Sequence, residues 1–212
     1  APLLPATFAQ FEARTGQRIL ERYGMSEAGI ITSNPRAGER VPGTVGYALP
    51  GFELRVVDGD GREVAPHVAG MLEIRGPSVF GGYWRRPELQ ASEFRDGWFV
   101  TGDLVTRAGD GRVTIVGRAR DLVISGGFNV YPKEIELEID ALPGVIESAV
   151  IGVPHPDFGE AVVAVVAIES GAALDEAALV GALGDRLARF KLPKRVLFVD
   201  DLPRNAMAKV QK

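Results

Sequence analysis

The sequence has no cysteine and only two histidines, His67 and His155, among its 212 residues. Without cysteine, the chain forms neither a disulfide scaffold nor a thiolate-bound metal or redox centre. The histidines are far apart in the sequence and each lies beside a proline, a pattern that disfavours a metal pair or a histidine-based catalytic triad. The sequence therefore excludes cysteine-based active sites and disfavours histidine-based ones.

The sequence also lacks the marks of membrane, nucleic-acid-binding and disordered proteins. Its longest apolar run, residues 161–168, has the length of a strand, whereas a membrane span needs about 20 residues. Lys and Arg number 24 against 28 Asp and Glu, for a net charge of −4, with no basic run that would bind nucleic acid. Hydrophobic residues make up 46 % of the chain, which is too many for a disordered protein. We expect a globular, cytoplasmic protein with neither nucleic acid nor membrane as a partner.

The first part of the chain has the pattern of a mostly β segment. A short amphipathic helix is predicted over residues 4–14, followed by a strand over residues 18–23 that ends before Gly24. Apolar residues alternate over residues 52–56, and residues 71–74 are expected to form the partner strand. Turn signals rich in Gly and Asp separate such runs.

The second part of the chain alternates between strands and helices. Strands are predicted over residues 148–153 and 161–168, and helices over residues 132–142 and 175–190. This alternation predicts an α/β (α+β) fold, with a boundary near residue 120 between a β-rich part and a small α/β part.

Four segments carry polar, charged or glycine residues that a fold alone does not require. They are Tyr23-Gly24-Met25-Ser26-Glu27, Thr101-Gly102-Asp103, the arginines and glycines of residues 117–129, and Leu202–Lys209. Each has a functional and a purely structural interpretation.

The first two segments have the chemistry of a nucleotide site. An aromatic ring, a hydroxyl and a carboxylate at residues 23–27 could stack on a base, contact phosphate and bind Mg²⁺, but Ser26 or Glu27 could equally cap a helix. Asp103 could accept hydrogen bonds from a ribose diol, or form an Asx turn after Gly102.

The last two segments have the chemistry of a mobile, cationic site. Arg118 and Arg120 could bind nucleotide or a partner, or form a surface charge cluster, and Gly126-Gly127 permits close backbone approach or a large change in φ and ψ. Lys209, in a loop of small residues, could present its charge to phosphate or carboxylate, or be an exposed lysine of the tail.

In this order and spacing, the four segments resemble the C-terminal part of the adenylate-forming enzymes, which include acyl-CoA synthetases, luciferases and peptide-synthetase adenylation domains. The resemblance covers nearly the whole chain. It also rests on Gly-Tyr-Trp at residues 82–84, Trp-Phe at 98–99 and Gly-Gly-Phe-Asn-Val-Tyr-Pro-x-Glu-Ile-Glu at 126–136. Within the family, residues 152–160 and 203–212 look most like malonyl-CoA synthetase.

The resemblance implies a division of the chain into two unequal parts. Residues 1–119 would be the C-terminal portion of the large adenylation domain, including a β-barrel-like subdomain, and residues 120–212 the small mobile C-terminal domain. The family's phosphate loop and most of its acid-binding pocket lie upstream of every motif present. The lack of an initiator Met and the end of the chain soon after Lys209 fit a truncation.

The resemblance also implies roles for individual residues. Tyr23 would stack on adenine, with Gly24 and Met25 beside it in the site for ATP and AMP, while Ser26 would contact the α-phosphate and Glu27 would bind Mg²⁺. Asp103 would hold the ribose hydroxyls with Arg118 next to it, and Arg120 would be the hinge. The residues expected at the coenzyme A site are Gly126, Gly127, Phe128 and Asn129. Lys209 would be the catalytic lysine that bridges the carboxylate, the ribose and the α-phosphate.

The activity implied is an ATP-dependent acid–thiol ligation in the full-length protein. Malonate, ATP and coenzyme A would give malonyl-CoA, AMP and diphosphate through a malonyl-adenylate, with Mg²⁺ as cofactor. The alternatives are a ligase for another acid (methylmalonate, an aryl acid or a fatty acid) or an inactive C-terminal fragment, and we expect the chain alone to be inactive. One departure from the family is Ala208, which stands where glycine is usual and would strain a φ > 0 backbone by roughly 1 kcal/mol.

Overall fold

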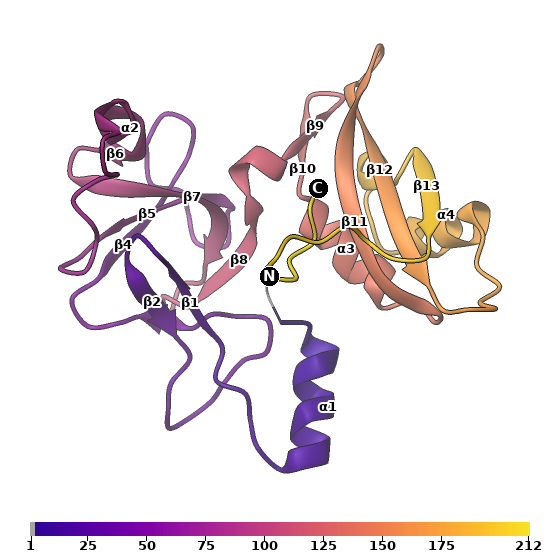
Figure 1. The fold of residues 1–212 in the computed structure, drawn as a ribbon, viewed down its shortest axis with the longest axis horizontal. Coiled ribbons are helices and arrows are strands. Elements are labelled where there is room, and N and C mark those ends of the chain that lie inside the picture. The colour runs from indigo at the N-terminus through magenta and orange to yellow at the C-terminus, as the bar shows by residue number, and fades with distance from the viewer. Residues whose placement is uncertain (1–2) are drawn as a thin grey trace. The chain divides into compact units, whose positions relative to one another are not determined.

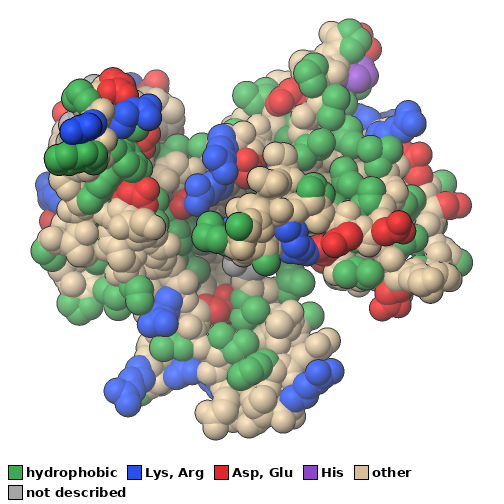
Figure 2. All heavy atoms as spheres, in the orientation of Figure 1, with side chains coloured by type: hydrophobic (Ala, Val, Ile, Leu, Met, Phe, Trp, Pro, Cys, Tyr) green, Lys and Arg blue, Asp and Glu red, His purple; other side chains and the backbone are tan. Residues whose placement is uncertain are grey.

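The chain forms two compact units, Ala1–Ala119 and Arg120–Lys212, in a computed structural model that describes residues 3–212 (Figure 1). Each unit contains β-sheet and short helices and has its own hydrophobic core, which confirms the α/β (α+β) class. Among residues 3–212, no helix has the length and apolar character that crossing a membrane requires. Basic and acidic side chains lie interspersed over the face seen in Figure 2.

The first unit is built mainly from two antiparallel sheets. One has the strand order β1-β2-β3, and the other has β4-β5-β7-β6 with β8 paired to β7. The elements are α1 (Pro5–Thr15), β1 (Arg22–Met25), β2 (Gly29–Ser33), β3 (Tyr47–Ala48), β4 (Glu53–Val57), β5 (Gly70–Arg75), α2 (Pro87–Glu93), β6 (Phe94–Arg95), β7 (Trp98–Arg107) and β8 (Val113–Arg118). Alternate residues of these strands, such as Leu72, Ile74 and Val105, are fully buried in one core.

The second unit is a five-stranded sheet whose helices pack on its buried side. The strand order is β10-β9-β12-β11, and β13 pairs with β12 in parallel, as expected of a strand reached through a helical crossover. The elements are the 3₁₀ helix Ala119–Asp121, β9 (Val123–Ser125), β10 (Phe128–Val130), α3 (Pro132–Asp140), β11 (Val145–His155), β12 (Gly159–Ile168), α4 (Glu176–Gly184), the 3₁₀ helix Arg189–Lys191 and β13 (Arg195–Val199). Ile135 and Ile139 of α3 and Leu179 and Leu183 of α4 join the core of the sheet.

The strand predicted over residues 18–23 is wrong in its position. The strand β1 begins at Arg22 and continues through Gly24 to Met25, where the sequence predicts a break. Gly24 belongs to the strand because it has no side chain: a Cβ there would lie 2.3 Å from the carbonyl oxygen of Gly29. The polar and glycine-rich texture of this segment reflects a close backbone approach, not the end of the strand.

The helix predicted over residues 175–190 is correct only for its first half. The helix α4 ends at Gly184, and a turn and a short 3₁₀ helix follow. Glycines at 181 and 184 weaken the helix, because glycine costs about 1 kcal/mol relative to alanine in a helix interior. Leu187 lies in the turn and still packs against the core. Its four-residue spacing from Leu183 therefore arises because both side chains are packed in the core, and not because the helix continues.

Candidate nucleotide and catalytic site

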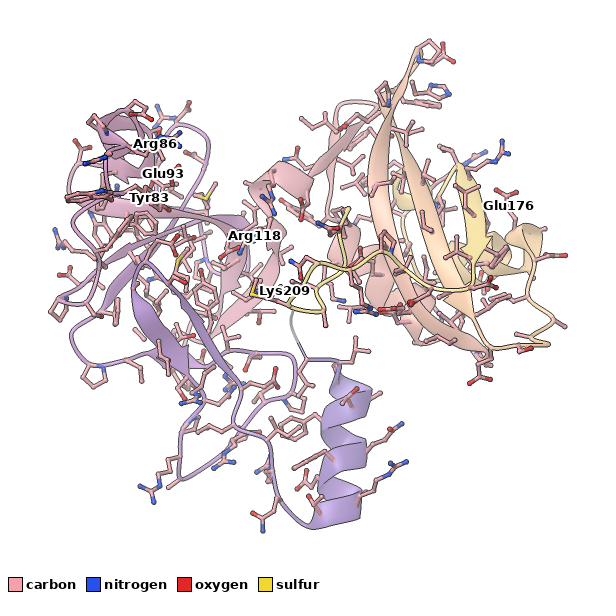
Figure 3. All side chains as sticks on the ribbon, viewed as in Figure 1. Tyr83, Arg86, Glu93, Arg118, Glu176 and Lys209 are labelled. Carbon is pink, nitrogen blue, oxygen red and sulfur yellow. The ribbon has the colours of Figure 1, made fainter. Side chains whose placement is uncertain are left out.

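The first unit brings together three predicted site residues that are up to 95 positions apart in the sequence (Tyr23 to Arg118). The hydroxyl of Tyr23 on β1 donates a hydrogen bond of 2.6 Å to Oδ2 of Asp103 on β7. Nε of Arg118, at the end of β8, lies 3.1 Å from Oδ1 of the same carboxylate (Figure 3). Asp103 is only 4 % exposed. Its two carboxylate oxygens are thus buried, and each has one partner, the phenol of Tyr23 or the guanidinium of Arg118.

The protonation of Tyr23 is set by this environment. Burial raises the pKa of the Tyr23 hydroxyl far above its usual value, and the charge and hydrogen bond of Asp103 raise it further. Tyr23 therefore stays a neutral donor, and its ring is fixed relative to the carboxylate.

The interpretation of Thr101-Gly102-Asp103 as a turn is wrong. These residues lie inside the long strand β7. On either side of them, Val100 pairs with Glu73 and Leu104 pairs with Met71 of β5. The three residues of β7 therefore lie opposite a single residue of β5, Leu72, which makes a bulge. Gly102 supplies the φ of +73° that this bulge requires. Thr101 secures it, because its hydroxyl donates to the Leu72 carbonyl at 2.8 Å and accepts from the Asp103 amide at 3.1 Å. The bulge is the device that presents Asp103.

Ser26 and Glu27 lie in the tight turn that joins β1 to β2. The helix cap considered for them is therefore wrong, since a strand follows and not a helix. The Ala28 amide donates to the Met25 carbonyl, and Gly29 closes the turn with a φ of +68°. The hairpin places Tyr23 and Glu27 on one rigid element.

Residues 78–83, which are distant in the sequence, form hydrogen bonds to this turn. The Ser78 hydroxyl donates to the Ala28 carbonyl at 3.0 Å, and the Phe80 amide donates to the Glu27 carbonyl at 2.8 Å. The Tyr83 hydroxyl donates to Oε1 of Glu27 at 2.9 Å. Both the backbone and the carboxylate of Glu27 are thus held.

Tyr83 contacts the candidate site through Glu27, although no sequence motif assigned it a role. Partial burial and the Glu27 carboxylate raise the pKa of the Tyr83 hydroxyl to about 12, so it remains a donor. Its ring packs edge-on against Phe80 at 4.7 Å between centroids. The available signal was its place in Gly-Tyr-Trp, which carried the family resemblance but no role.

The setting of Glu27 fits a magnesium ligand. Among the described residues, its Oε2 makes no hydrogen bond or ion pair, while Oε1 is held by Tyr83. Within residues 3–212 there is no group of three or more acidic or histidine side chains that could enclose an ion. Mg²⁺ commonly takes one or two carboxylates together with substrate phosphates, so a single presented carboxylate suits a metal that arrives with ATP.

The glycine pair of the second unit forms the two-residue turn between β9 and β10. Gly126 and Gly127 have φ of +58° and +81°, the pattern of a type I′ hairpin. The Gly126 amide donates to the Phe158 carbonyl at 2.9 Å, which ties this turn to the β11–β12 hairpin. Phe128 is exposed and stacks on Phe190 at 4.6 Å, and the next residue of β10, Asn129, is exposed as well.

Lys209 lies in a closed hairpin loop and is exposed to solvent (Figure 3). Arg204 and Val210 pair across the base of the loop, and the Asn205 amide donates to the Lys209 carbonyl at 2.9 Å. Oδ1 of Asn205 accepts from the amides of Met207 and Lys209 at 2.9 and 3.0 Å. Asn205 therefore organises the loop that carries the lysine.

Two further predicted residues have simpler settings. Arg120 lies in the exposed 3₁₀ helix where the two units divide, and its Nε is 3.5 Å from Oδ1 of Asp121. Ala208 has a φ of +58°, so the left-handed backbone that glycine would favour at this position is present.

Two parts of the sequence match one family of known proteins. Residues 1–84 match the AMP-binding enzyme, and residues 134–209 match the C-terminal domain of that enzyme. The chain belongs to the AMP-binding enzyme family. The resemblance to adenylate-forming acyl-CoA synthetases is thereby confirmed.

Individual members of the family are similar along nearly the whole chain. Indoleacetate–CoA ligase of Aromatoleum aromaticum is 39 % identical over 212 residues, covering 99 % of this chain and 42 % of that protein. Mitochondrial malonate–CoA ligase ACSF3 of Mus musculus is 39 % identical, covering 96 % of this chain and 38 % of that protein. The structure of ATP-bound MatB from Rhodopseudomonas palustris is 60 % identical with a TM-score of 0.96, covering 100 % of this chain and 42 % of that chain. The chain thus spans well under half the length of these relatives.

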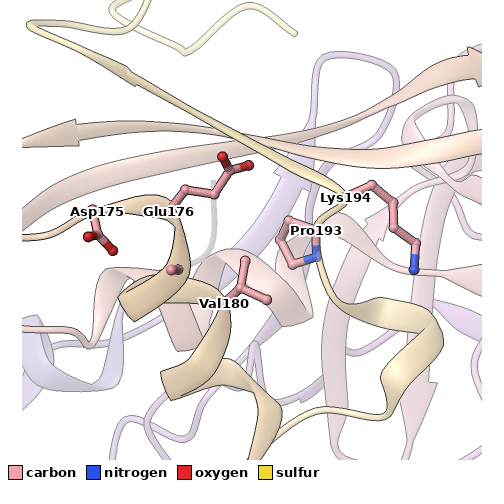
Figure 4. Close-up of a pocket in the computed structure, with 6 residues that line it drawn as sticks. Asp175, Glu176, Val180, Pro193 and Lys194 are labelled. Carbon is pink, nitrogen blue, oxygen red and sulfur yellow. The ribbon is translucent and has the colours of Figure 1, made fainter.

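A surface hollow of the second unit takes no part in the motifs of the AMP-binding family. About 500 Å³ in volume, it is lined by Asp175, Glu176, Ala177, Val180, Pro193 and Lys194 (Figure 4). Asp175 caps α4 by accepting from the Ala178 amide at 2.8 Å, and Glu176 accepts from the Val196 amide at 2.7 Å. Both acidic side chains are occupied in holding the fold.

Proposed function

We propose that the full-length protein is an ATP-dependent acid–thiol ligase that converts malonate, ATP and coenzyme A into malonyl-CoA, AMP and diphosphate. The observation that carries the proposal is the buried Asp103 carboxylate, held by Tyr23 and Arg118 beside the hairpin of Glu27, in a chain of the AMP-binding family. Malonate is favoured by the malonate–CoA ligase among the relatives and by the family resemblance of residues 152–160.

We also propose that the two units are parts of different domains. Residues 1–119 would complete a larger adenylation domain, and residues 120–212 would be a small domain that rotates about Arg120. The separate cores of the two units and the much greater length of the relatives support this division.

The first half-reaction joins the acid to AMP. A malonate carboxylate oxygen attacks the α-phosphorus of ATP, and diphosphate leaves with the electron pair of the broken P–O bond. Asp103 accepts hydrogen bonds from the ribose hydroxyls, the Tyr23 ring stacks on adenine, and Ser26 contacts the α-phosphate. Glu27 would hold Mg²⁺, which when bound neutralises charge on the phosphates. The ammonium of Lys209 stabilises the charge of the transition state, because two anions must approach each other.

The second half-reaction transfers the acyl group to a thiol. The thiol sulfur of coenzyme A attacks the acyl carbon of the adenylate and the thiol proton is released. The acyl C–O bond breaks, and AMP leaves with its electron pair. Rotation of the small domain would withdraw Lys209 and bring the turn of Gly126 and Gly127, with Phe128 and Asn129, to the pantetheine path. Both glycines have a positive φ, which disfavours any residue with a side chain at these positions. The tip of the turn therefore has no side chain, which supports this role because a ligand can approach its backbone closely.

Replacing Lys209 with alanine tests the catalytic assignment. In the full-length protein, we expect Lys209→Ala to lower malonate-dependent ATP–diphosphate exchange by about 100-fold or more, because a charge that acts in the transition state is lost. Thioester formation from supplied malonyl-adenylate should be spared. Arg186→Ala, which removes another cation of the second unit, is the matched control. Undiminished exchange by Lys209→Ala would refute the role of this lysine.

The choice of acid needs a separate experiment. The indoleacetate–CoA ligase is 39 % identical to this chain, so an aryl acid is a specific second candidate. ATP–diphosphate exchange by the full-length protein, measured with malonate, methylmalonate, an aryl acid and a fatty acid, compares them directly. Exchange with another acid and none with malonate would reject malonate while leaving the ligase activity in place.

A further inference from the structure

The hairpin that carries Lys209 is attached to the second unit by two ion pairs, one on each arm. On the first arm, the guanidinium of Arg204 contacts the Glu147 carboxylate on β11. On the second arm, the ammonium of Lys212 contacts the Glu136 carboxylate on α3. Both carboxylates belong to the same unit as the hairpin, and the two contacts flank the lysine in the sequence.

Glu136 is a rigid anchor. Its side chain is only 6 % exposed, and Oε1 also accepts from the Val150 amide of β11 at 2.9 Å. Nζ of Lys133 lies 3.8 Å from Oε2. A buried carboxylate with these partners is fixed relative to both α3 and the sheet, so the position of Lys212 is fixed with it.

Arg204 connects its anchor directly to the loop. While Nη2 contacts Glu147, Nη1 donates to the carbonyl of Ala208 at 2.9 Å, one residue before Lys209. The backbone pairing of Arg204 with Val210 closes the base of the loop. One guanidinium therefore joins β11 to the backbone next to the lysine.

We propose that Glu147 and Glu136, acting through Arg204 and Lys212, are positioning residues for Lys209. They hold the hairpin as a fixed part of the second unit, so that Lys209 stands on an ordered loop and not on a flexible tail. This inference rests on the proposed catalytic role of Lys209.

The first test measures how firmly the loop is held. Glu147→Gln removes the charge from a partly exposed side chain and keeps its size, so the fold should be retained. In the full-length protein we expect backbone amide exchange of the peptide covering residues 203–212 to accelerate by about tenfold, because local opening becomes easier. The control is Glu138→Gln on α3, whose partner is Arg186 at 3.2 Å, and it should leave this peptide unchanged.

The second test separates positioning from a merely structural role. We expect Glu147→Gln to lower malonate-dependent adenylation by about tenfold or more, because misplacement of a catalytic group is costly. Thioester formation from supplied adenylate should not change. Lys212→Met, which breaks the other ion pair without touching the buried carboxylate, should act in the same direction.

The outcomes distinguish this inference from the proposed function. Unchanged amide exchange in both Glu147→Gln and Lys212→Met would overturn the inference. Faster amide exchange with unimpaired adenylation would overturn the positioning role of the two carboxylates. It would leave the catalytic role of Lys209 standing, since Lys209→Ala tests that role separately. Equal losses in adenylation and thioester formation would show general damage and overturn the positioning role.

Discussion

The backbone at Ala208 has a φ of +58°, a left-handed conformation that costs an L-residue roughly 1 kcal/mol or more. Strain at an alanine requires a positive φ, and the structure has one at this position. The alanine is tolerated because Asn205 and Arg204 hold the loop on both sides.

Ala208→Gly should therefore stabilise the loop. Relief of roughly 1 kcal/mol of strain is offset in part by the greater chain entropy of glycine in the unfolded state, about 0.5 kcal/mol. We expect a net gain of a few tenths of a kcal/mol in the free energy of unfolding, measured by chemical denaturation. Ala206→Gly is the control. The φ of Ala206 is not positive, so this substitution relieves no strain and should only lower the free energy of unfolding. A loss at Ala208 as large as that at Ala206 would contradict the strain.

The residues of the site differ in how far the sequence could specify them. Asp103 and Tyr23 were predicted from their motifs, but their hydrogen bond joins strands 80 positions apart and depends on the bulge in β7. Tyr83 and Glu147 were assigned no role, because a lone tyrosine or glutamate has no local signal for a distant partner. Such contacts follow only from the folded arrangement.

At the scale of elements, the β1–β2 hairpin depends on two glycines for different reasons. Gly29 is needed for its positive φ, with open space around its Cα. Gly24 is needed for the close approach of the neighbouring strand, because a Cβ would lie 2.3 Å from the Gly29 oxygen and 2.9 Å from Cα of Ile30.

Gly24→Ala should open the hairpin that carries Glu27. Backbone atoms are the obstacle, so the strands must separate, and we expect a loss of roughly 1–3 kcal/mol in the free energy of unfolding. Gly59→Ala is the control, since Gly59 has open space and no positive φ. Urea denaturation of both variants measures the difference, and equal stability of the two would refute the crowding at Gly24.

At the scale of the whole molecule, the two units have cores with no residue in common. Leu72, Ile74 and Val105 lie in the core of the first unit, and Ile135 and Leu179 in that of the second. Both tryptophans of the chain, Trp84 and Trp98, belong to the first unit. The guanidiniums of Arg55 and Arg75 lie over the Trp98 ring, at 4.6 and 4.7 Å from its centroid, so the fluorescence of Trp98 reports the folding of that unit.

Ile135→Ala should destabilise the second unit alone. Removing this fully buried side chain leaves a cavity that costs about 2–5 kcal/mol, which lowers the melting temperature of a small domain by roughly 10 °C or more. The melting temperature measured by tryptophan fluorescence should not change. A calorimetric transition, that of the second unit, should shift to a lower temperature. Ile74→Ala, in the first unit, should move the fluorescence transition instead. A common shift of both signals in Ile135→Ala would show that the units unfold together.

The sequence by itself determined the fold class, the family and most elements, because alternating and helical periodicities and the order of short motifs are local properties of the chain. It placed the strand of residues 18–23 wrongly, because a close contact between backbones overrides the local pattern there. It placed the end of the helix of residues 175–190 wrongly, because Leu187 keeps a helical spacing although glycines at 181 and 184 weaken the helix before it. Only the tertiary structure decided that Thr101–Asp103 forms a bulge, that Tyr83 holds Glu27, and that Glu136 and Glu147 hold the Lys209 hairpin. Each of these depends on partners that are distant in the sequence, and only folding brings them within hydrogen-bonding distance.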